Sequence, residues 1–150
     1  MATYPAITPE TLTLLEQLSS SACVLRNEEF RLVWCNKAYE RMSFETLDEM
    51  RGNRMHDYLP KEAADEREAC YIQALNSDRM LRVIQLGADE RLICIMIPID
   101  AEAFGFKGVV NILQQAPNSG TLRSDDYDIV LRTPCMDSLG MLTTSELRVL

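Results

Sequence analysis

Two apolar runs in the second half of the chain constrain the fold more than any other feature. Residues 91–99 (RLICIMIPI) and 106–115 (FKGVVNILQQ) are each too short and too rich in isoleucine and valine for a helix of an ordinary soluble domain. Both are apolar on the two alternating faces of a strand, which is typical of a central strand covered on both sides. The segment 100–105 between them is polar and ends in glycine, as a hairpin connection does. The sequence therefore predicts a two-stranded antiparallel centre.

The rest of the chain supplies elements that surround this centre. The order is helix, two strands, several short helices and three strands, which predicts an α+β domain. We expect a five-stranded antiparallel sheet with short helices on one face and an N-terminal helix. The further strands are expected at residues 22–26, 30–35 and 80–86, short helices after the capping residues Asn36 and Thr46, and a long helix at residues 61–76.

The first helix begins with Thr8 as its N-cap and Pro9 at its first helical position, and is expected to extend to about residue 19. Helical spacing predicts one stripe that covers the sheet, formed by Thr11, Leu14, Leu15 and Leu18. Leu12 lies off this stripe and is available for a second contact. We therefore expect Leu12 and Leu15 to contact a second subunit, although the helix could equally pack only on its own domain.

Composition limits the class of protein. With 150 residues, 47% apolar and 25% charged, the chain is predicted to form one globular domain with a short appendage. A net charge of −8 makes it a poor ligand for DNA phosphates. Neither a long apolar run nor an export signal is visible, so we expect no membrane span. The five cysteines are odd in number and widely spaced, which favours a reducing cytoplasm and argues against structural zinc.

Three segments carry a family resemblance. Residues 25–36 look like an opening hairpin followed by a helix-capping asparagine, residues 50–60 like a Gly-then-Leu-Pro connector into the long helix, and residues 108–113 like a last strand. In this order they resemble the PAS sensory domain over roughly residues 7–115. The family's frequent Asp-x-Thr ending is absent, because residues 114–116 read Gln-Gln-Ala. The resemblance implies a ligand cavity between the sheet and the long helix.

The C-terminal tail resembles a second family. Thr143 and Glu146 form a capping box, and Leu142 with Leu147 forms the hydrophobic staple across it. Together with Val149 and Leu150, these residues resemble the start of the first helix of the LuxR-type helix-turn-helix domain. The recognition helix of such a domain would lie beyond residue 150, so we expect no specific DNA binding by these residues alone.

These resemblances divide the chain into four parts. We expect an N-terminal helix at residues 1–20, a PAS-like sensory domain at 21–115, a linker at 116–140 and the truncated helix-turn-helix start at 141–150. The linker could hold a strand or a helical turn around residues 127–131. The expected function is a cytoplasmic sensing and dimerisation module of a bacterial-type transcriptional regulator. Its partners would be a second copy, an unknown small molecule, and DNA only through the missing C-terminal part.

Five residues are candidates for ligand contacts. Arg67 falls on the apolar stripe of the long helix, where a guanidinium could hold a carboxylate ligand or form a salt bridge with Glu66 or Glu68. Asn111 interrupts an apolar strand and could face the cavity or the first helix. His56, the single histidine, could be a haem ligand or a surface residue. The hydroxyl groups that could face the cavity belong to Tyr39 and Tyr71, with Tyr58 as a further donor.

Several functions find no support in the sequence. It lacks a second histidine, a Gly-x-Ser-x-Gly elbow, a phosphate-binding loop and metal-ligand spacing, so we assign no catalytic residue and no metal ligand. The cysteine that flavin adduct chemistry needs is missing from residues 52–55, while non-covalent flavin binding stays open, and the cofactor is unknown. The alternatives are a ligand-free structural dimerisation module, a small pocket enzyme and a haem sensor.

Overall fold

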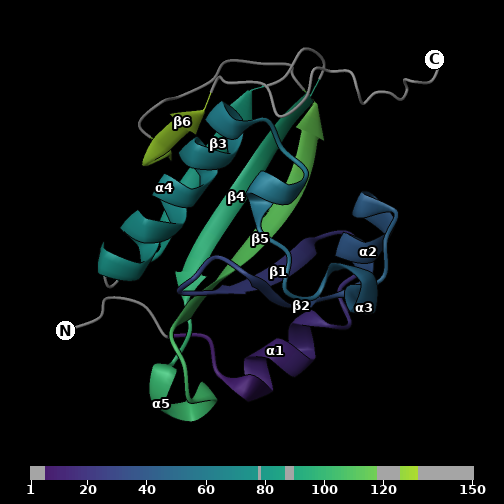
Figure 1. Cartoon of the computed structure of the whole chain (residues 1–150), viewed down its shortest axis with the longest axis vertical. Helices are drawn as coiled ribbons and strands as arrows, with labels where there is room; N and C mark the ends of the chain where they lie inside the picture. The colour runs from purple at the N-terminus through teal and green to yellow at the C-terminus, as the bar shows by residue number, and fades with distance from the viewer. Residues whose placement is uncertain (1–5, 78, 87–89, 118–125, 132–150) are drawn as a thin grey trace.

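The computed structural model describes residues 6–77, 79–86, 90–117 and 126–131. Its centre is one six-stranded sheet with the order β2-β1-β5-β4-β3-β6 (Figure 1). The strands are β1 (Ala22–Asn27), β2 (Leu32–Cys35), β3 (Leu81–Leu86), β4 (Glu90–Pro98), β5 (Gly108–Pro117) and β6 (Ile129–Leu131). Strands β4 and β5 form the antiparallel middle pair, with Cys94 opposite Leu113, which confirms the predicted centre.

The five predicted antiparallel strands and the α+β fold are confirmed, and a sixth strand that was not predicted in the sheet makes it mixed. The sixth strand, β6, pairs parallel to β3. Asp128 starts this pairing, because its backbone N–H donates to the Arg82 carbonyl and its carboxylate accepts from the Arg82 N–H, both at 2.8 Å. The apolar triplet Ile-Val-Leu of β6 then covers an edge that would otherwise expose unpaired backbone groups. Of the two conformations expected around residues 127–131, the chain adopts the strand.

The helices begin largely where their capping residues predict. They are α1 (Pro9–Leu15), α2 (Lys37–Ser43), α3 (Leu47–Met50), the 3-10 helix η1 (Met55–Asp57), α4 (Lys61–Ser77) and α5 (Ala101–Phe104). Asn36 accepts the Tyr39 N–H at 3.0 Å, and Thr46 forms a capping box with Glu49. The expected hairpin connection at 100–105 does join β4 to β5, and it contains the helical turn α5, because Asp100 caps this turn and Gly105, at φ +86°, ends it.

Helix α1 differs from its prediction in length and in orientation. It ends at Leu15 rather than near residue 19, since residues 17 and 18 make tighter i→i+3 bonds before three serines, which favour turns over helix. Leu12 and Leu15 pack on the sheet, whereas Leu14 is 65% exposed. Placing Leu14 on the covering stripe and Leu12 off it was therefore wrong.

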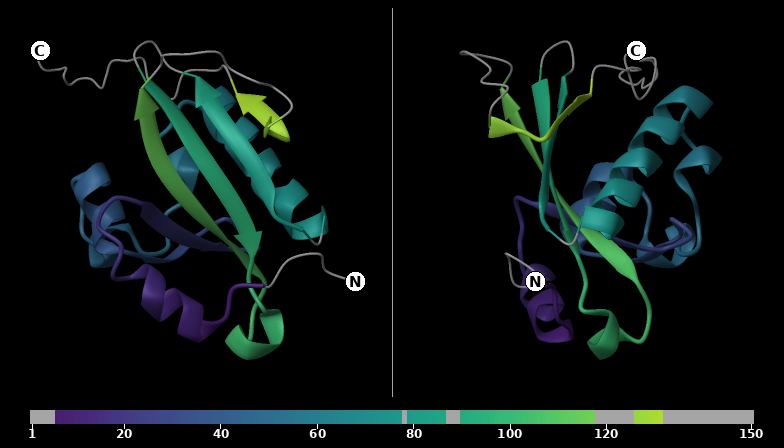
Figure 2. Two further views of the ribbon diagram at one scale, coloured as in Figure 1. Left: turned by 180° about the vertical axis from the view of Figure 1, so that it is seen from behind. Right: turned by 90° about the vertical axis from the view of Figure 1, so that its left-hand side faces the viewer.

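Helices lie on both faces of the sheet, and the two faces differ. Helices α2, η1 and α4 cover one face, here called the inner face, while α1 lies on the opposite, outer face (Figure 2). Because side chains alternate along a strand, Val24 and Arg26 of β1 point to the inner face and Leu25 to the outer one. No helix in the described part of the chain is both long enough and apolar enough to cross a membrane.

Candidate functional site

A cavity of about 110 Å³ lies between the inner face and the helices above it. A water molecule needs roughly 10–15 Å³ on this measure, so the space suits a small organic molecule or several waters. A second hollow of about 20 Å³ adjoins it and shares Met55, Arg67, Tyr71, Gln85 and Asn111 with its wall. The main cavity is lined by Val24, Arg26, Tyr39, Met55, Tyr58, Leu59, Arg67, Tyr71, Gln85, Leu92, Asn111 and Leu113.

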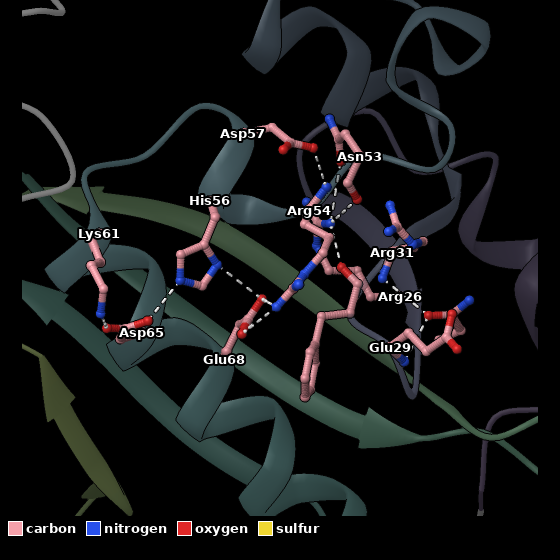
Figure 3. Close-up of polar contacts among 12 residues, drawn as sticks. Arg26, Glu29, Arg31, Asn53, Arg54, His56, Asp57, Lys61, Asp65 and Glu68 are labelled. Carbon is pink, nitrogen blue, oxygen red and sulfur yellow. Dashed lines mark hydrogen bonds and ion pairs between the residues drawn. The ribbon is translucent and has the colours of Figure 1, made fainter.

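Arg26 is the most deeply buried charged residue of this wall, with 2% of its surface exposed. Its Nη1 donates to the carbonyls of Phe30 and Asn53, both at 2.9 Å, and its Nη2 donates to the Tyr58 hydroxyl at 2.8 Å. The bonds to Asn53 tie β1 to the segment before η1 (Figure 3). The bond to Tyr58 ties β1 to the residue that follows η1. Arg26 follows Ala22 and Val24 on the inner side of β1, a period-2 signal that sequence reasoning overlooked.

The hydroxyl groups around Arg26 are neutral, so they do not compensate its charge. Burial raises the pKa of Tyr58 and raises that of Tyr71 to about 12, despite the opposing effect of the Arg26 cation. Burial lowers the pKa of Arg26, but the neighbouring tyrosines raise it, and the net direction is upward. The guanidinium is therefore a permanent cation in a wall of protonated phenols.

Arg67 lies on the inward side of α4, as predicted, and is 8% exposed. Its Nη2 donates to Gln85 Oε1 at 2.8 Å, and its Nη1 lies 3.4 Å from Glu66 Oε1. Of the two expected acidic partners the structure provides Glu66, while Glu68 pairs with Arg54. Arg67 thus has a salt bridge at the edge of the helix and also forms part of the cavity wall.

Asn111 faces the cavity and not α1, which resolves the alternative that the sequence left open. It is 9% exposed, and its Oδ1 is buried without a hydrogen-bond partner among the described residues. A hydrogen bond with Asn111 lowers the pKa of Tyr71 against the larger effect of burial, so the two side chains are in contact. Tyr39 and Tyr71 line the same cavity, so four of the five candidate residues meet there.

His56 is the candidate that the structure does not bring to the cavity wall. Its Nε2 lies 2.7 Å from Asp65 Oδ1, and its Nδ1 lies 3.2 Å from Glu68 Oε2 without hydrogen-bond alignment (Figure 3). Glu68 also binds Arg54 Nη2 at 2.9 Å, and Lys61 reaches Asp65 at 2.7 Å. This ionic cluster fastens α4 to η1, which contributes Met55 to the cavity wall.

A wider hollow of about 460 Å³ opens at the surface beside α2. It shares Leu92 and Leu113 with the wall of the inner cavity. Leu113 is 8% exposed and Leu92 is half-buried, so these two side chains separate the cavity from the surface hollow.

The described residues hold no group of three or more histidine, cysteine or acidic side chains placed to bind a metal ion. Burial raises the pKa of the Cys23, Cys35 and Cys70 thiols to about 11, so these groups stay protonated and unreactive near neutral pH. Cys135 and the helix start at residues 141–150 lie outside the described residues.

Comparison with known proteins identifies the architecture. A family model described as the PAS fold matches residues 15–113, well over half of the chain. A sensory box sensor histidine kinase from Vibrio cholerae has a TM-score of 0.57 at 19% identity, with 72% of this chain and 90% of that chain covered. The PAS domain of Bordetella pertussis BvgS has a TM-score of 0.55 at 18% identity, with 75% and 85% covered.

A domain of an HTR-like protein from Haloarcula marismortui has a TM-score of 0.55 at 14% identity and covers 63% of this chain and 96% of that one. At these identities the likeness concerns the fold alone. A search of curated proteins found no match.

Proposed function

Because this chain belongs to the PAS fold family, we propose that it is the signal-sensing and dimerisation module of a bacterial-type transcriptional regulator. The observation that carries the proposal is the cavity on the inner face, which combines an apolar wall with two arginines, three tyrosines and an unpaired amide oxygen. A small pocket with a few convergent polar groups is the usual form of a ligand site. A ligand that binds one domain arrangement better than another would shift the population towards that arrangement.

The signal would leave the domain through β5. This strand carries Asn111 on the cavity and ends at Pro117, where the sequence predicts the linker to begin. Beyond it, the capping box of Thr143 and Glu146 supports a LuxR-type helix-turn-helix. DNA would be contacted only through this C-terminal part, including a recognition helix beyond residue 150.

Dimerisation is proposed to use the outer face and α1. Ile93 and Ile95 of β4 are half-buried on this face and belong to neither core cluster, and Leu14 of α1, the helix that lies on this face, is exposed. Such apolar surface is best covered by a second subunit. Leu12 and Leu15, which hold α1 on the sheet, would position the helix for this contact. The absence of disulfides among Cys23, Cys35 and Cys70 is compatible with the proposed cytoplasmic location.

Native mass spectrometry of the freshly purified chain tests both halves of the proposal. We expect a dimer that retains a small molecule, which denaturing extraction would release for identification. A strict monomer with no retained molecule would contradict the proposal. A dimer that carries no molecule and binds none would favour the alternative, a ligand-free structural dimerisation module.

The same preparation separates two further possibilities. A Soret band would favour a haem sensor, with His56 freed from Asp65 and Glu68 to reach the iron. An electrophoretic shift of DNA by these 150 residues alone, at physiological salt, would contradict the assignment of DNA binding to the C-terminal part.

A further inference from the structure

We infer that the cavity on the inner face selects a small organic carboxylate that also carries a hydrogen-bond donor. The inference deepens the proposed sensor function and rests on it, because it names the chemical class of the signal. Its first ground is the charge of the wall. Two arginines, Arg26 and Arg67, line the cavity, and no aspartate or glutamate is among the described residues that line it. The chain as a whole has 23 acidic and 15 basic residues, so this wall has the opposite sign to the protein.

The second ground is the lack of an anion beside Arg26. All its hydrogen-bond acceptors are neutral: two backbone carbonyls, the Asn53 amide and the Tyr58 hydroxyl. No described acidic side chain lies within salt-bridge distance of it. Removing a guanidinium from water without an opposite charge is unfavourable, and a ligand carboxylate would supply that charge. Arginine binds carboxylates bidentately, which adds orientation to affinity.

Arg67 adds a second positive charge to the cavity wall, from helix α4. Its acidic partner Glu66 is 36% exposed at the helix edge and does not line the cavity. At 3.4 Å the contact is long for a charge-assisted hydrogen bond. Among the described contacts of Arg67, the acidic one lies at the solvent-facing helix edge, and the one in the cavity wall is to the neutral Gln85.

The third ground is the buried acceptor on β5. Asn111 Oδ1 has no partner among the described residues, so a ligand hydroxyl, amine or amide N–H would satisfy it. Val24 pairs with Asn111 in the sheet, which makes Arg26 a diagonal neighbour of Asn111 on the same face. Diagonal neighbours in antiparallel strands lie roughly 7–8 Å apart. A compact hydroxy-acid spans that separation and fits the cavity of about 110 Å³.

The substitution Asn111→Asp tests the charge of the cavity without any ligand. It keeps the size of the side chain and places a carboxylate among Arg26, Arg67 and the hydroxyl groups of Tyr39, Tyr58 and Tyr71. If positive charge dominates, the introduced carboxylate titrates below the ordinary aspartate pKa of about 3.9. The free energy of unfolding of N111D relative to wild type then rises as the pH increases from the lowered folded pKa through the unfolded value of about 3.9, and it stays level above about pH 5.

The contrary result has the opposite sign. If the arginines are neutralised from elsewhere, burial raises the pKa of the introduced carboxylate, and N111D loses stability relative to wild type as the pH rises from about 4 towards that raised pKa. Carbon-13 NMR of the labelled carboxyl gives its pKa directly. N111L, which has similar size and no charge, is the control for lost hydrogen bonding.

Isothermal titration with matched probes tests the ligand class. The probes are 2-hydroxybutyrate, butyrate, 2-hydroxybutyramide and inorganic phosphate. We expect the hydroxy-acid to bind best and its neutral amide at least about tenfold more weakly, with N111D losing affinity for the acid by a similar factor. Equal binding of acid and amide, binding of phosphate only, or no binding of any anion at millimolar concentration would overturn the inference. A neutral molecule retained by the purified dimer would also overturn it while leaving the proposed sensor function intact.

Discussion

The two faces of the sheet share the same strands but differ in almost every other respect. On the inner face, β1 and β5 place Arg26 and Asn111 beneath three helices, and a cavity remains between them. On the outer face, the alternate residues of the same strands, Leu25 and Val110, form a compact cluster under α1. A period of two residues thus lets one strand build a polar site and an apolar surface at once.

This difference separates the two proposed functions physically. The inner face contains buried cations and, at Asn111 Oδ1, a buried acceptor without a partner among the described residues, and such groups cost stability unless a bound molecule compensates them. On the outer face the cluster around Leu25 is apolar, and Ile93 and Ile95 of the same face stay half-buried, which is the surface that the proposed partner subunit would cover. Substitutions on one face are therefore expected to leave the function of the other intact, and this independence is open to test.

The largest effect is expected from truncating the outer cluster. Leu25→Ala removes a side chain that is 1% exposed, and we expect the free energy of unfolding to fall by about 3 kcal/mol. The matched control Leu14→Ala changes a side chain that is 65% exposed, and we expect a change within about 0.5 kcal/mol. Urea denaturation followed by circular dichroism measures both. Similar losses for the two variants would contradict the observed orientation of α1.

Features of the fold that depend on neighbouring residues were predicted from the sequence, and those that depend on distant residues were not. The middle strands β4 and β5 and the caps Asn36 and Thr46 depend on local composition and local hydrogen bonds, and all are confirmed. The parallel strand β6 depends on an edge formed by residues more than forty positions earlier (Val83 pairs with Ile129), which no local pattern reveals. Sequence reasoning therefore placed the element but not its partner.

The residues of the candidate site were also predicted only in part. Arg67 and Asn111 interrupt apolar patterns, so they were found from sequence, and both line the cavity. Arg26 was missed because a charged residue near a strand end usually lies in solvent, while its burial depends on Asn53 and Tyr58, about thirty residues away. Leu12 was wrongly placed off the stripe that covers the sheet, because α1 ends early and a short helix shows a less distinct apolar stripe than a long one.

A lysine on the outer face is expected to separate the subunits. Ile95→Lys places a charge where β4 is half-buried and pairs with Ile112, so the proposed dimer would have to bury it. We expect a loss of about 2 kcal/mol, equivalent to a roughly 30-fold higher dissociation constant in sedimentation equilibrium. Ile72→Lys on α4, which is 46% exposed, is the control and should leave the dimer unchanged. Loss of carboxylate binding together with the dimer would show that the two faces do not act independently.

A smaller effect is expected from one hydroxyl on the inner face. Tyr58→Phe removes the acceptor of the 2.8 Å bond from Arg26 Nη2 and leaves a donor of the buried cation unpaired. We expect the free energy of unfolding to fall by about 1.5 kcal/mol, the usual range for a hydrogen bond to a charged group. The dimer should not change, since Tyr58 lies on the opposite face from α1. An unchanged or increased stability would show that solvent or another side chain replaces the hydroxyl without loss.

The smallest effect is expected at the ionic cluster that fastens η1 to α4. Hydrogen bonds from Lys61 and then from His56 lower the pKa of Asp65 below its ordinary value. A lowered pKa in the folded state stabilises the protein above the unfolded pKa of about 3.9, and this contribution disappears as the pH falls through the folded value. Asp65→Asn should therefore reduce the thermal midpoint slightly at neutral pH, and the difference from wild type should vanish in acid.

Lys61→Met provides the control for this assignment. Lys61 is the first cause of the lowered pKa, so in its absence the further substitution of Asp65 should change the thermal midpoint less than it does in wild type. If the effect of Asp65→Asn is the same with and without Lys61, His56 is the main partner of Asp65. The link between η1 and α4 would then depend mainly on His56, whose Nε2 lies 2.7 Å from Asp65 Oδ1.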